Sequence, residues 1–155
     1  MGSSENKEDK VMCDKKKLQK VKGGLTYHSD STGTIVVEMY IRQYAINANI
    51  FIGLITNDEG YPEPFANVTV NTELPLPAYC GFVDVNNLPD AEKFIAENDL
   101  GEFLGIRRKY GYCEYPLYQF NEDKLRELCP EELEDYEQNL REIEEAFERE
   151  VKKHE

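Results

Sequence analysis

The chain has 155 residues, the size of one domain, and 40% of them are hydrophobic. Its ten Tyr and seven Phe are unlike a disordered chain, which combines high charge with few aromatics. The net charge of −13 disfavours binding to nucleic acid or anionic membranes and favours a basic protein partner. No apolar run approaches the roughly 20 residues of a membrane helix, and the first ten residues lack a secretory signal, so we expect a cytoplasmic protein.

Charge is unevenly distributed along the chain. Residues 1–22 hold seven Lys against four acids, whereas residues 121–155 hold six bases against fourteen acids. The first segment also lacks apolar periodicity, so we predict a disordered Lys-rich arm at 1–22 and a single α+β domain at 23–155. We interpret the arm as a solubilising extension, with a basic docking arm as the alternative.

The first half of the predicted domain has strand patterns. Alternating apolar and polar residues at 34–42 predict a half-buried strand, and the more apolar run at 49–56 is typical of a central one. Further strands are expected around 66–71 and 79–85. The proline-containing segment 74–77 separates them, because its prolines cannot donate ladder hydrogen bonds.

Helical patterns appear in the second half. A short helix is predicted between Pro89 and Asn98, with these residues on its apolar side: Ala91, Phe94 and Ile95. Two more strands are expected at 103–110 and 114–120, and Asn121 begins another helix as its N-cap. The fold is therefore predicted as α+β, with a mostly antiparallel sheet of about five to six strands, a short middle helix and a long last helix.

The last helix, predicted over residues 130–153, has the strongest local signal in the chain. Apolar residues recur at 3-4-3-4 spacing: Leu133, Tyr136, Leu140, Ile143 and Phe147. Acids in the first turns and Lys152 and Lys153 in the last complement the helix dipole. Three pairs at i,i+4 spacing add support: Glu137/Arg141, Glu145/Arg149 and Glu148/Lys152.

The apolar face of this helix needs a partner. The favoured interpretation is the sheet of the same chain, because the pattern spans little more than two heptads. The alternative is another molecule, including a second copy, which would make the protein a homo-oligomer through this helix. On the polar face, carboxylates are candidates for meeting a basic partner: Glu134, Glu137, Glu142, Glu145 and Glu148.

A second candidate surface is the segment 110–118, which contains four tyrosines in nine positions. Tyrosine is enriched at interfaces, although a partly buried edge strand explains the same composition. The candidate partner-binding residues here are Tyr112, Glu114 and Tyr115.

The cysteines do not have the spacing of a zinc or thioredoxin motif. They are predicted to be free and mostly buried: Cys13, Cys80, Cys113 and Cys129. A thiol enzyme would need His28 as base and Cys80 or Cys113 as nucleophile, whereas ordinary buried cysteines are the favoured interpretation. We find no calcium-loop, zinc-protease or phosphate-loop motif, so no catalytic residue, metal ligand or cofactor is assigned.

Three segments together resemble a family of small acidic proteins. They are residues 63–71, 74–87 and 111–120, within a likeness that spans about residues 24–128 and leaves out the arm and the last helix. The chain resembles an uncharacterised domain-of-unknown-function family of gut Gram-positive bacteria, often carried on conjugative or phage-like elements. The resemblance implies a setting and no catalytic residues.

That setting suggests a function by analogy. Small acidic proteins of mobile elements include inhibitors of restriction enzymes and CRISPR nucleases, some of which present carboxylates in place of phosphates. We therefore expect a non-catalytic binding protein that inhibits a basic, nucleic-acid-handling protein of the host, without binding nucleic acid directly. The alternatives are an accessory or oligomerising module and a cysteine-dependent enzyme.

Overall fold

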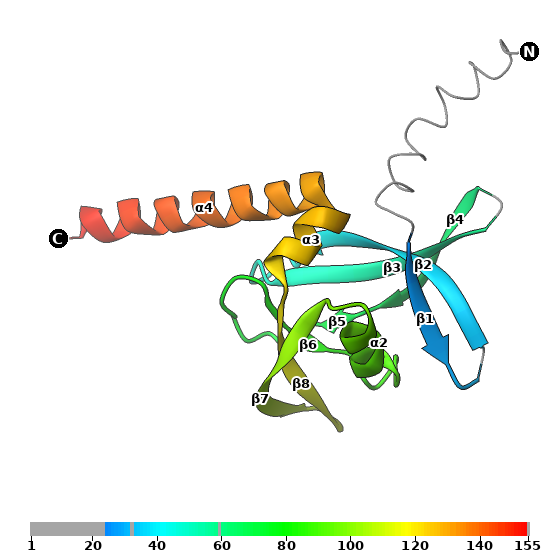
Figure 1. Cartoon of the computed structure of the whole chain (residues 1–155). Helices are drawn as coiled ribbons and strands as arrows, with labels where there is room; N and C mark the ends of the chain where they lie inside the picture. Colours follow the sequence, from blue (N-terminus) through cyan, green and yellow to red (C-terminus); the bar gives the residue numbers. More distant parts are fainter. Residues whose placement is uncertain (1–23, 32, 59, 155) are drawn as a thin grey trace, which may run out of the picture.

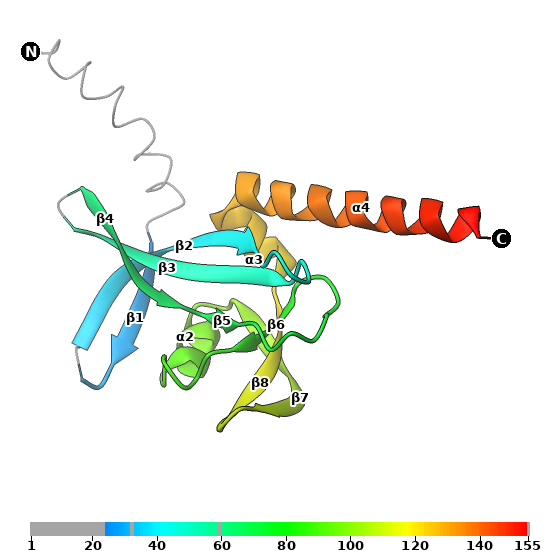
Figure 2. The ribbon, with the colours of Figure 1, turned by 180° about the vertical axis from the view of Figure 1, so that it is seen from behind.

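The computed structural model describes residues 24–31, 33–58 and 60–154, which form two four-stranded antiparallel sheets and three helices (Figures 1 and 2). The predicted arm at residues 1–22 lies outside the described residues. The first sheet has the order β1-β2-β3-β4, with bounds Leu25–Ser29, Gly33–Gln43, Ile50–Asp58 and Tyr61–Asn67. The second has the order β5-β6-β8-β7, with bounds Thr69–Val70, Cys80–Val83, Cys113–Phe120 and Gly101–Tyr110.

The alternation in β2 determines which face of the first sheet is buried. Alternate residues in its second half point into the core beside apolar residues of β3: Val37, Met39 and Ile41 with Ile50, Ile52 and Leu54. On the other face Tyr40 lies opposite Gly53 in the register. The Tyr40 ring occupies the space of the missing side chain, since a Cβ on Gly53 would lie 2.4 Å from Tyr40 Cζ.

The chain passes from one sheet to the other at Val68, which is fully buried. Its N–H donates to the carbonyl of Ile52 in β3, at 2.8 Å, and its own carbonyl accepts from Asp84, directly after β6, also at 2.8 Å. The two sheets are therefore joined by backbone hydrogen bonds. One buried cluster contains side chains from both sheets and from all three helices of the described residues.

β8 is buried over most of its length, because both of its faces are covered. Tyr118 and Phe120 belong to the main core, whereas Tyr115 and Leu117 pack in a smaller cluster with Cys80 and Phe82. Its neighbour β7 is an edge strand and is exposed from residue 102 to residue 110.

The helices begin and end where the sequence indicates. The α2 helix, Ala91–Glu97, buries the predicted apolar side. The Asn121 side chain accepts a hydrogen bond from Lys124 N at 3.2 Å and caps α3, Glu122–Leu128. The α4 helix, Pro130–Lys153, begins with proline at its first position, where the lack of an N–H costs no hydrogen bond.

The predicted α+β class and antiparallel strands are confirmed, but the structure has more strands than the five to six expected. The difference lies in β1, for which no strand was expected, and in the strand expected at 66–71, which divides at Val68 between the end of β4 and β5. β1 is short; β4 contains Pro62 and Pro64, which an edge strand tolerates; and β5 has only two residues. Such segments have little alternation of apolar and polar residues, and their strand conformation depends on hydrogen bonds to neighbouring strands.

Candidate protein-binding surface on the last helix

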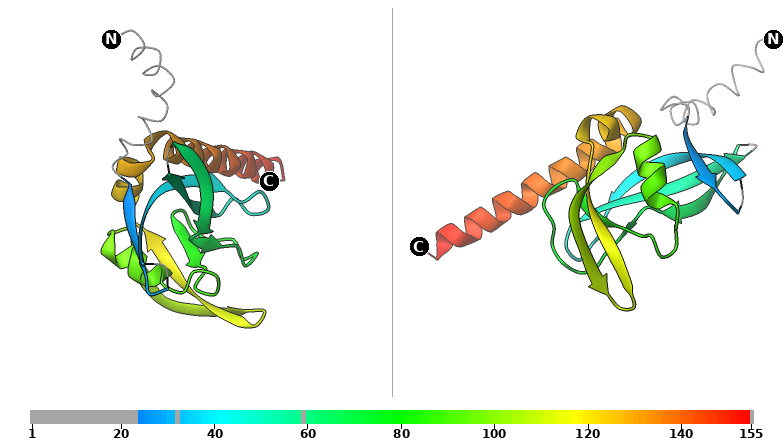
Figure 3. Two further views of the ribbon diagram at one scale, coloured as in Figure 1. Left: turned by 90° about the vertical axis from the view of Figure 1, so that its right-hand side faces the viewer. Right: turned by 60° about the horizontal axis from the view of Figure 1, so that its bottom comes forward.

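The α4 helix divides into a docked half and a free half. Leu133 and Tyr136 are buried in the main core, and Leu140 packs against that core from its edge. Beyond Leu140 every residue is exposed through His154. Figure 3 shows this free half, residues 141–153, projecting away from both sheets. The preferred interpretation, in which the apolar face packs on the same chain's sheet, thus holds only for the first half of the helix.

The docked half is held by the edge of β2. β1 pairs only with residues 33–37 of β2, so among the described residues the edge beyond lacks a strand neighbour in the first sheet. Cys129 Sγ donates to the Met39 carbonyl there, at 3.2 Å, and Glu132 Oε1 accepts from the Ile41 N–H, at 2.7 Å. Side chains at the start of α4 thereby replace the missing strand.

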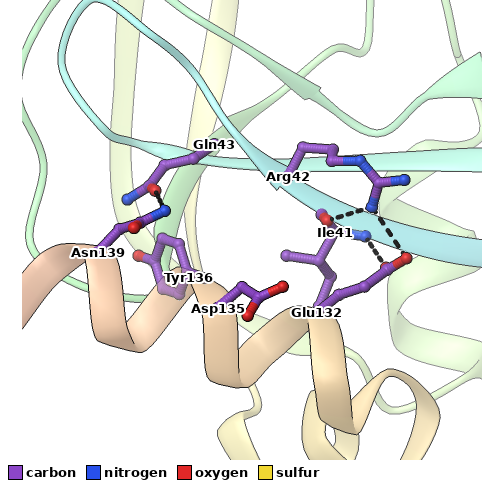
Figure 4. A pocket seen from close by; sticks show the side chains of 7 residues that line it. All are labelled: Ile41, Arg42, Gln43, Glu132, Asp135, Tyr136 and Asn139. Carbon is purple, nitrogen blue, oxygen red and sulfur yellow. Dashed lines mark hydrogen bonds and ion pairs between the residues drawn. The ribbon is translucent and has the colours of Figure 1, made fainter.

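Further contacts fix the direction of α4 along this edge (Figure 4). Arg42 Nη1 lies 2.9 Å from Glu132 Oε2, and Asn139 Nδ2 donates to Gln43 Oε1 at 2.9 Å. The shallow pocket between these pairs, about 460 Å³, is lined by polar groups that mostly bond one another. We infer that these contacts hold α4 on the edge of β2 and so set the direction of its free half.

A cluster around Glu137 holds the other side of the docked half. Arg126 donates to both carboxylate oxygens of Glu137, at 2.7 and 3.2 Å, and the Tyr79 hydroxyl donates to the same carboxylate. The Tyr136 hydroxyl accepts from the Tyr79 N–H at 3.0 Å, which fixes Tyr79 in a left-handed conformation with φ of 65°. The bond to Arg126 holds the pKa of Glu137 below its ordinary value, and burial raises the pKa of Tyr79.

The free half presents an apolar stripe to solvent. Ile143 is 52% exposed, Phe147 68% and Val151 42%. Glu144 and Glu148 flank the stripe, because each lies three residues before one member and Glu148 follows Glu144 by four. We define the exposed stripe as Ile143, Phe147 and Val151. The apolar pattern predicted from the sequence ends at Phe147, although Val151 follows Phe147 by four residues. The predicted carboxylates likewise omit Glu144, which lies four residues before Glu148.

A depression lies between this helix and the turn that joins β2 to β3. Its volume is about 450 Å³. Four apolar side chains line it, Ala45 and Ala48 from the turn and Ile143 and Ala146 from α4, together with four polar ones: Gln43, Tyr44, Asn139 and Glu142. Beside it, Ile46 at the turn is 81% exposed. The depression and the exposed stripe share Ile143, so they adjoin each other.

The structure places the predicted carboxylates differently from one another. Glu134, Glu142, Glu145 and Glu148 are exposed, as expected. The expected exposed position of Glu137 is incorrect, since its side chain is only 13% exposed and it is bonded to Arg126 instead of Arg141. Arg141 lies near Glu134, at 3.6 Å.

The tyrosine-rich segment belongs to the β7–β8 hairpin of the second sheet, which lies at the opposite end of the molecule from α4 (Figures 1 and 2). Tyr112 at its turn is fully exposed, and Glu114 is exposed as well. Tyr115 is buried beside Leu117 and therefore belongs to the core. The fold does not bring these three residues together with the carboxylates of α4.

The two buried cysteines of the described residues, Cys80 and Cys129, do not have the character of an activated thiol. Cys80, Cys113 and Cys129 are free, and Cys13 lies outside the described residues. Burial raises the pKa of Cys80 and raises that of Cys129 to about 12, the opposite of the activation that a nucleophile needs. His28, the predicted base, lies in hydrogen-bond contact with Thr34, at 3.0 Å, and near Glu97.

The described residues contain no group of three or more His, Cys, Asp or Glu residues that could hold a metal ion. None of their helices is long and apolar enough to cross a membrane.

These features define a small α+β domain whose last helix extends beyond its core. The chain belongs to the family described as Domain of unknown function (DUF4313), which matches residues 38–140. No curated protein and no solved structure matches the chain.

The extent of the family match corrects the sequence analysis, which had left the whole of the last helix outside the resemblance. The match ends at Leu140, the last residue of α4 that packs against the core. The docked half of α4 is thus part of the family domain, and the free half follows it.

Proposed function

We propose that this protein is a non-enzymatic binding module that attaches to a basic partner protein through the free half of α4. The observation that carries the proposal is the exposed stripe on a helix that the docked half aims away from the domain. Three large apolar side chains in line on one helix face are typical of a surface that another protein covers.

Charge selects the class of partner. The chain carries −13 overall, and Glu144 and Glu148 border the exposed stripe directly. Within this proposal the partner is a nucleic-acid-handling protein, such as a CRISPR nuclease or a restriction enzyme, whose Lys and Arg side chains normally meet phosphates. The resemblance to proteins of mobile elements supports an inhibitory role toward such an enzyme.

Affinity capture with matched variants tests the proposal. The full chain, Phe147→Asp and Tyr112→Asp are compared as baits in a host lysate, because the last two exchange an exposed aromatic residue for the same acid on different surfaces. We expect a basic, nucleic-acid-binding protein to be captured by the full chain and by Tyr112→Asp and lost with Phe147→Asp. A plasmid-interference assay should show the same order.

Other results contradict the proposal. Capture that depends on Tyr112 and is indifferent to Phe147 would assign binding to the β7–β8 hairpin. If all three baits capture the same proteins and none of them protects a plasmid in the interference assay, there is no basis for a specific partner.

Self-association is the second candidate function, favoured by the exposed stripe alone. In an antiparallel pair of α4 helices the same flank of each helix meets its copy, which would bring Glu144 and Glu148 of both chains together. We therefore rank it below a basic partner. Mass measured by light scattering over a hundredfold concentration range decides it, since a strict monomer rules out self-pairing.

A further inference from the structure

We infer that the partner's docking element is a basic amphipathic helix that inserts one bulky apolar side chain into the depression between α4 and the β2–β3 turn. The inference rests on the proposed function and specifies what that surface recognises. It begins from the size of the depression, about 450 Å³. A cavity of about 150 Å³ is enough to hold benzene, so one aromatic or leucine side chain fits with room to spare.

The walls of the depression are fixed before any partner binds. The turn is closed by the Ala48 N–H, which donates to the Tyr44 carbonyl at 2.9 Å, and by the Tyr44 N–H, which donates to the Asn49 carbonyl at 2.9 Å. Gln43 Nε2 donates to the Ala48 carbonyl at 3.0 Å, and Gln43 Oε1 accepts from Asn139. The turn and α4 are therefore tied to each other, and binding costs little ordering of this surface.

The chemistry of the lining specifies the occupant. The alanines and Ile143 offer only apolar contacts, whereas Gln43, Tyr44, Asn139 and Glu142 complete the lining with polar groups. Glu142 has the Gln138 amide as its hydrogen-bond donor, at 3.0 Å, and no cation in ion-pair contact among the described residues. A partner with an apolar side chain next to a Lys or Arg would match both the apolar lining and the Glu142 carboxylate. Glu144 and Glu148 also favour cations, along the other side of the exposed stripe.

The shape of the surface favours a helix over a strand. From Ile143 to Val151 the exposed stripe runs about 12 Å along one helical face, and a partner helix matches it with residues at i, i+3, i+4 and i+7. An extended segment would gain no ladder here, because the backbone of α4 is bonded within the helix. The neighbouring edge of β2 is already occupied by Cys129 and Glu132.

The test uses a labelled 15-residue synthetic peptide with leucines at helical spacing and lysines elsewhere. A peptide of the same composition in scrambled order is its control. The full chain is compared with variants that fill the depression, Ala45→Trp and Ala146→Trp, and with Ala96→Trp, which makes the same exchange on an exposed residue of α2. Circular dichroism verifies that each variant is folded.

We expect fluorescence polarisation to show that the ordered peptide binds at least tenfold more tightly than the scrambled one. Ala45→Trp and Ala146→Trp should each weaken binding about tenfold, and Ala96→Trp should not change it. Phe147→Asp should also weaken binding, because it interrupts the exposed stripe.

Four outcomes overturn the inference. If Phe147→Asp weakens binding but both depression variants bind normally, the proposed function stands and the inserted side chain does not. If ordered and scrambled peptides bind alike, only charge attraction remains and both proposals fail. If deletion of residues 1–22 raises affinity tenfold, residues 1–22 of the same chain compete for the depression. If the protein alone is a dimer that Ala146→Trp dissociates, a second copy of the chain occupies it.

Discussion

The Arg126–Glu137 pair shows how a single carboxylate can change its role when the chain folds. By sequence Glu137 is one of many acids on a polar helix, but the fold places it against α3 and Tyr79, where it accepts three hydrogen bonds. A largely buried carboxylate is tolerated only with such partners. Glu137 is therefore a structural residue that locks α4 to the preceding helix.

Replacing Glu137 by Gln should destabilise the fold by about 1–3 kcal/mol at neutral pH, because Arg126 and Tyr79 lose a charged acceptor. The pKa of Glu137 is lowered in the folded state, so its contribution is complete above the ordinary carboxyl value of about 4.3 and is lost as the pH falls through the folded pKa. Urea unfolding at about pH 7 and about pH 3 should show the variant and the parent chain converging in acid. A difference that stays constant with pH would contradict this account.

The exposed Glu134→Gln is the matched control for that measurement. Glu134 lies 3.6 Å from Arg141 on the open face of α4, and such surface pairs contribute about 0–1 kcal/mol. Its unfolding free energy should stay close to that of the parent chain at both pH values.

The described cysteines should differ in reactivity according to their burial. Cys113 is half-buried, whereas Cys80 and Cys129 are buried and have raised thiol pKa values. Alkylation at about pH 8, located by peptide mass mapping, should modify Cys113 before the other two, which should react only after unfolding. Labelling of Cys129 as rapidly as Cys113 in the native protein would contradict the burial seen here.

At the scale of elements, α4 is one continuous helix with two roles. The helix and the charges that complement its dipole continue to Lys153, while the packing of its side chains on the main core stops at Leu140. An element can thus be regular over 24 residues and contribute packing energy over less than half of them.

Removing residues 141–155 should change the free energy of unfolding by less than about 1 kcal/mol, since the removed side chains that the structure describes are exposed. Leu133→Ala, in the docked half, should cost about 2–5 kcal/mol, because it leaves a cavity in the main core. Urea titrations of both variants measure the contrast. Equal losses would mean that the free half packs on the domain in solution.

At the scale of the whole molecule, the net charge of −13 acts together with the exposed stripe. Charge of one sign spread over a surface attracts a basic partner from a distance, but the attraction is screened within about 10 Å at 0.1 M salt. Short-range apolar contact is not screened. The two contributions should therefore separate in a salt titration.

Binding of the basic peptide should weaken as NaCl rises from about 50 to about 300 mM. Glu144→Gln combined with Glu148→Gln should reduce this salt dependence, because the charges bordering the exposed stripe are gone. Phe147→Ala should lower affinity by a similar factor at every salt concentration. Salt dependence unaffected by the double variant would place the electrostatic contact elsewhere on the surface.

The elements that could be predicted from the sequence are those that local interactions determine. The bounds of α4, the Asn121 cap and the alternation of β2 were predictable because they depend on neighbours within a few residues. β1, β4 and β5 were harder to predict, since their strand conformation depends on pairing with other strands. The candidate surface was predicted in part: the sequence indicated the helix and its acids but selected the polar face over the apolar one.

The sequence by itself determined that α4 exists, where it begins and ends, and which of its faces is apolar. Only the tertiary structure decided where the core stops beneath it. β1 is too short to cover β2 beyond Val37, so Cys129 and Glu132 cap the open edge and aim the helix past the end of the sheet. That geometry leaves Ile143, Phe147 and Val151 in solvent, because burial depends on what lies opposite a residue and not on its own pattern.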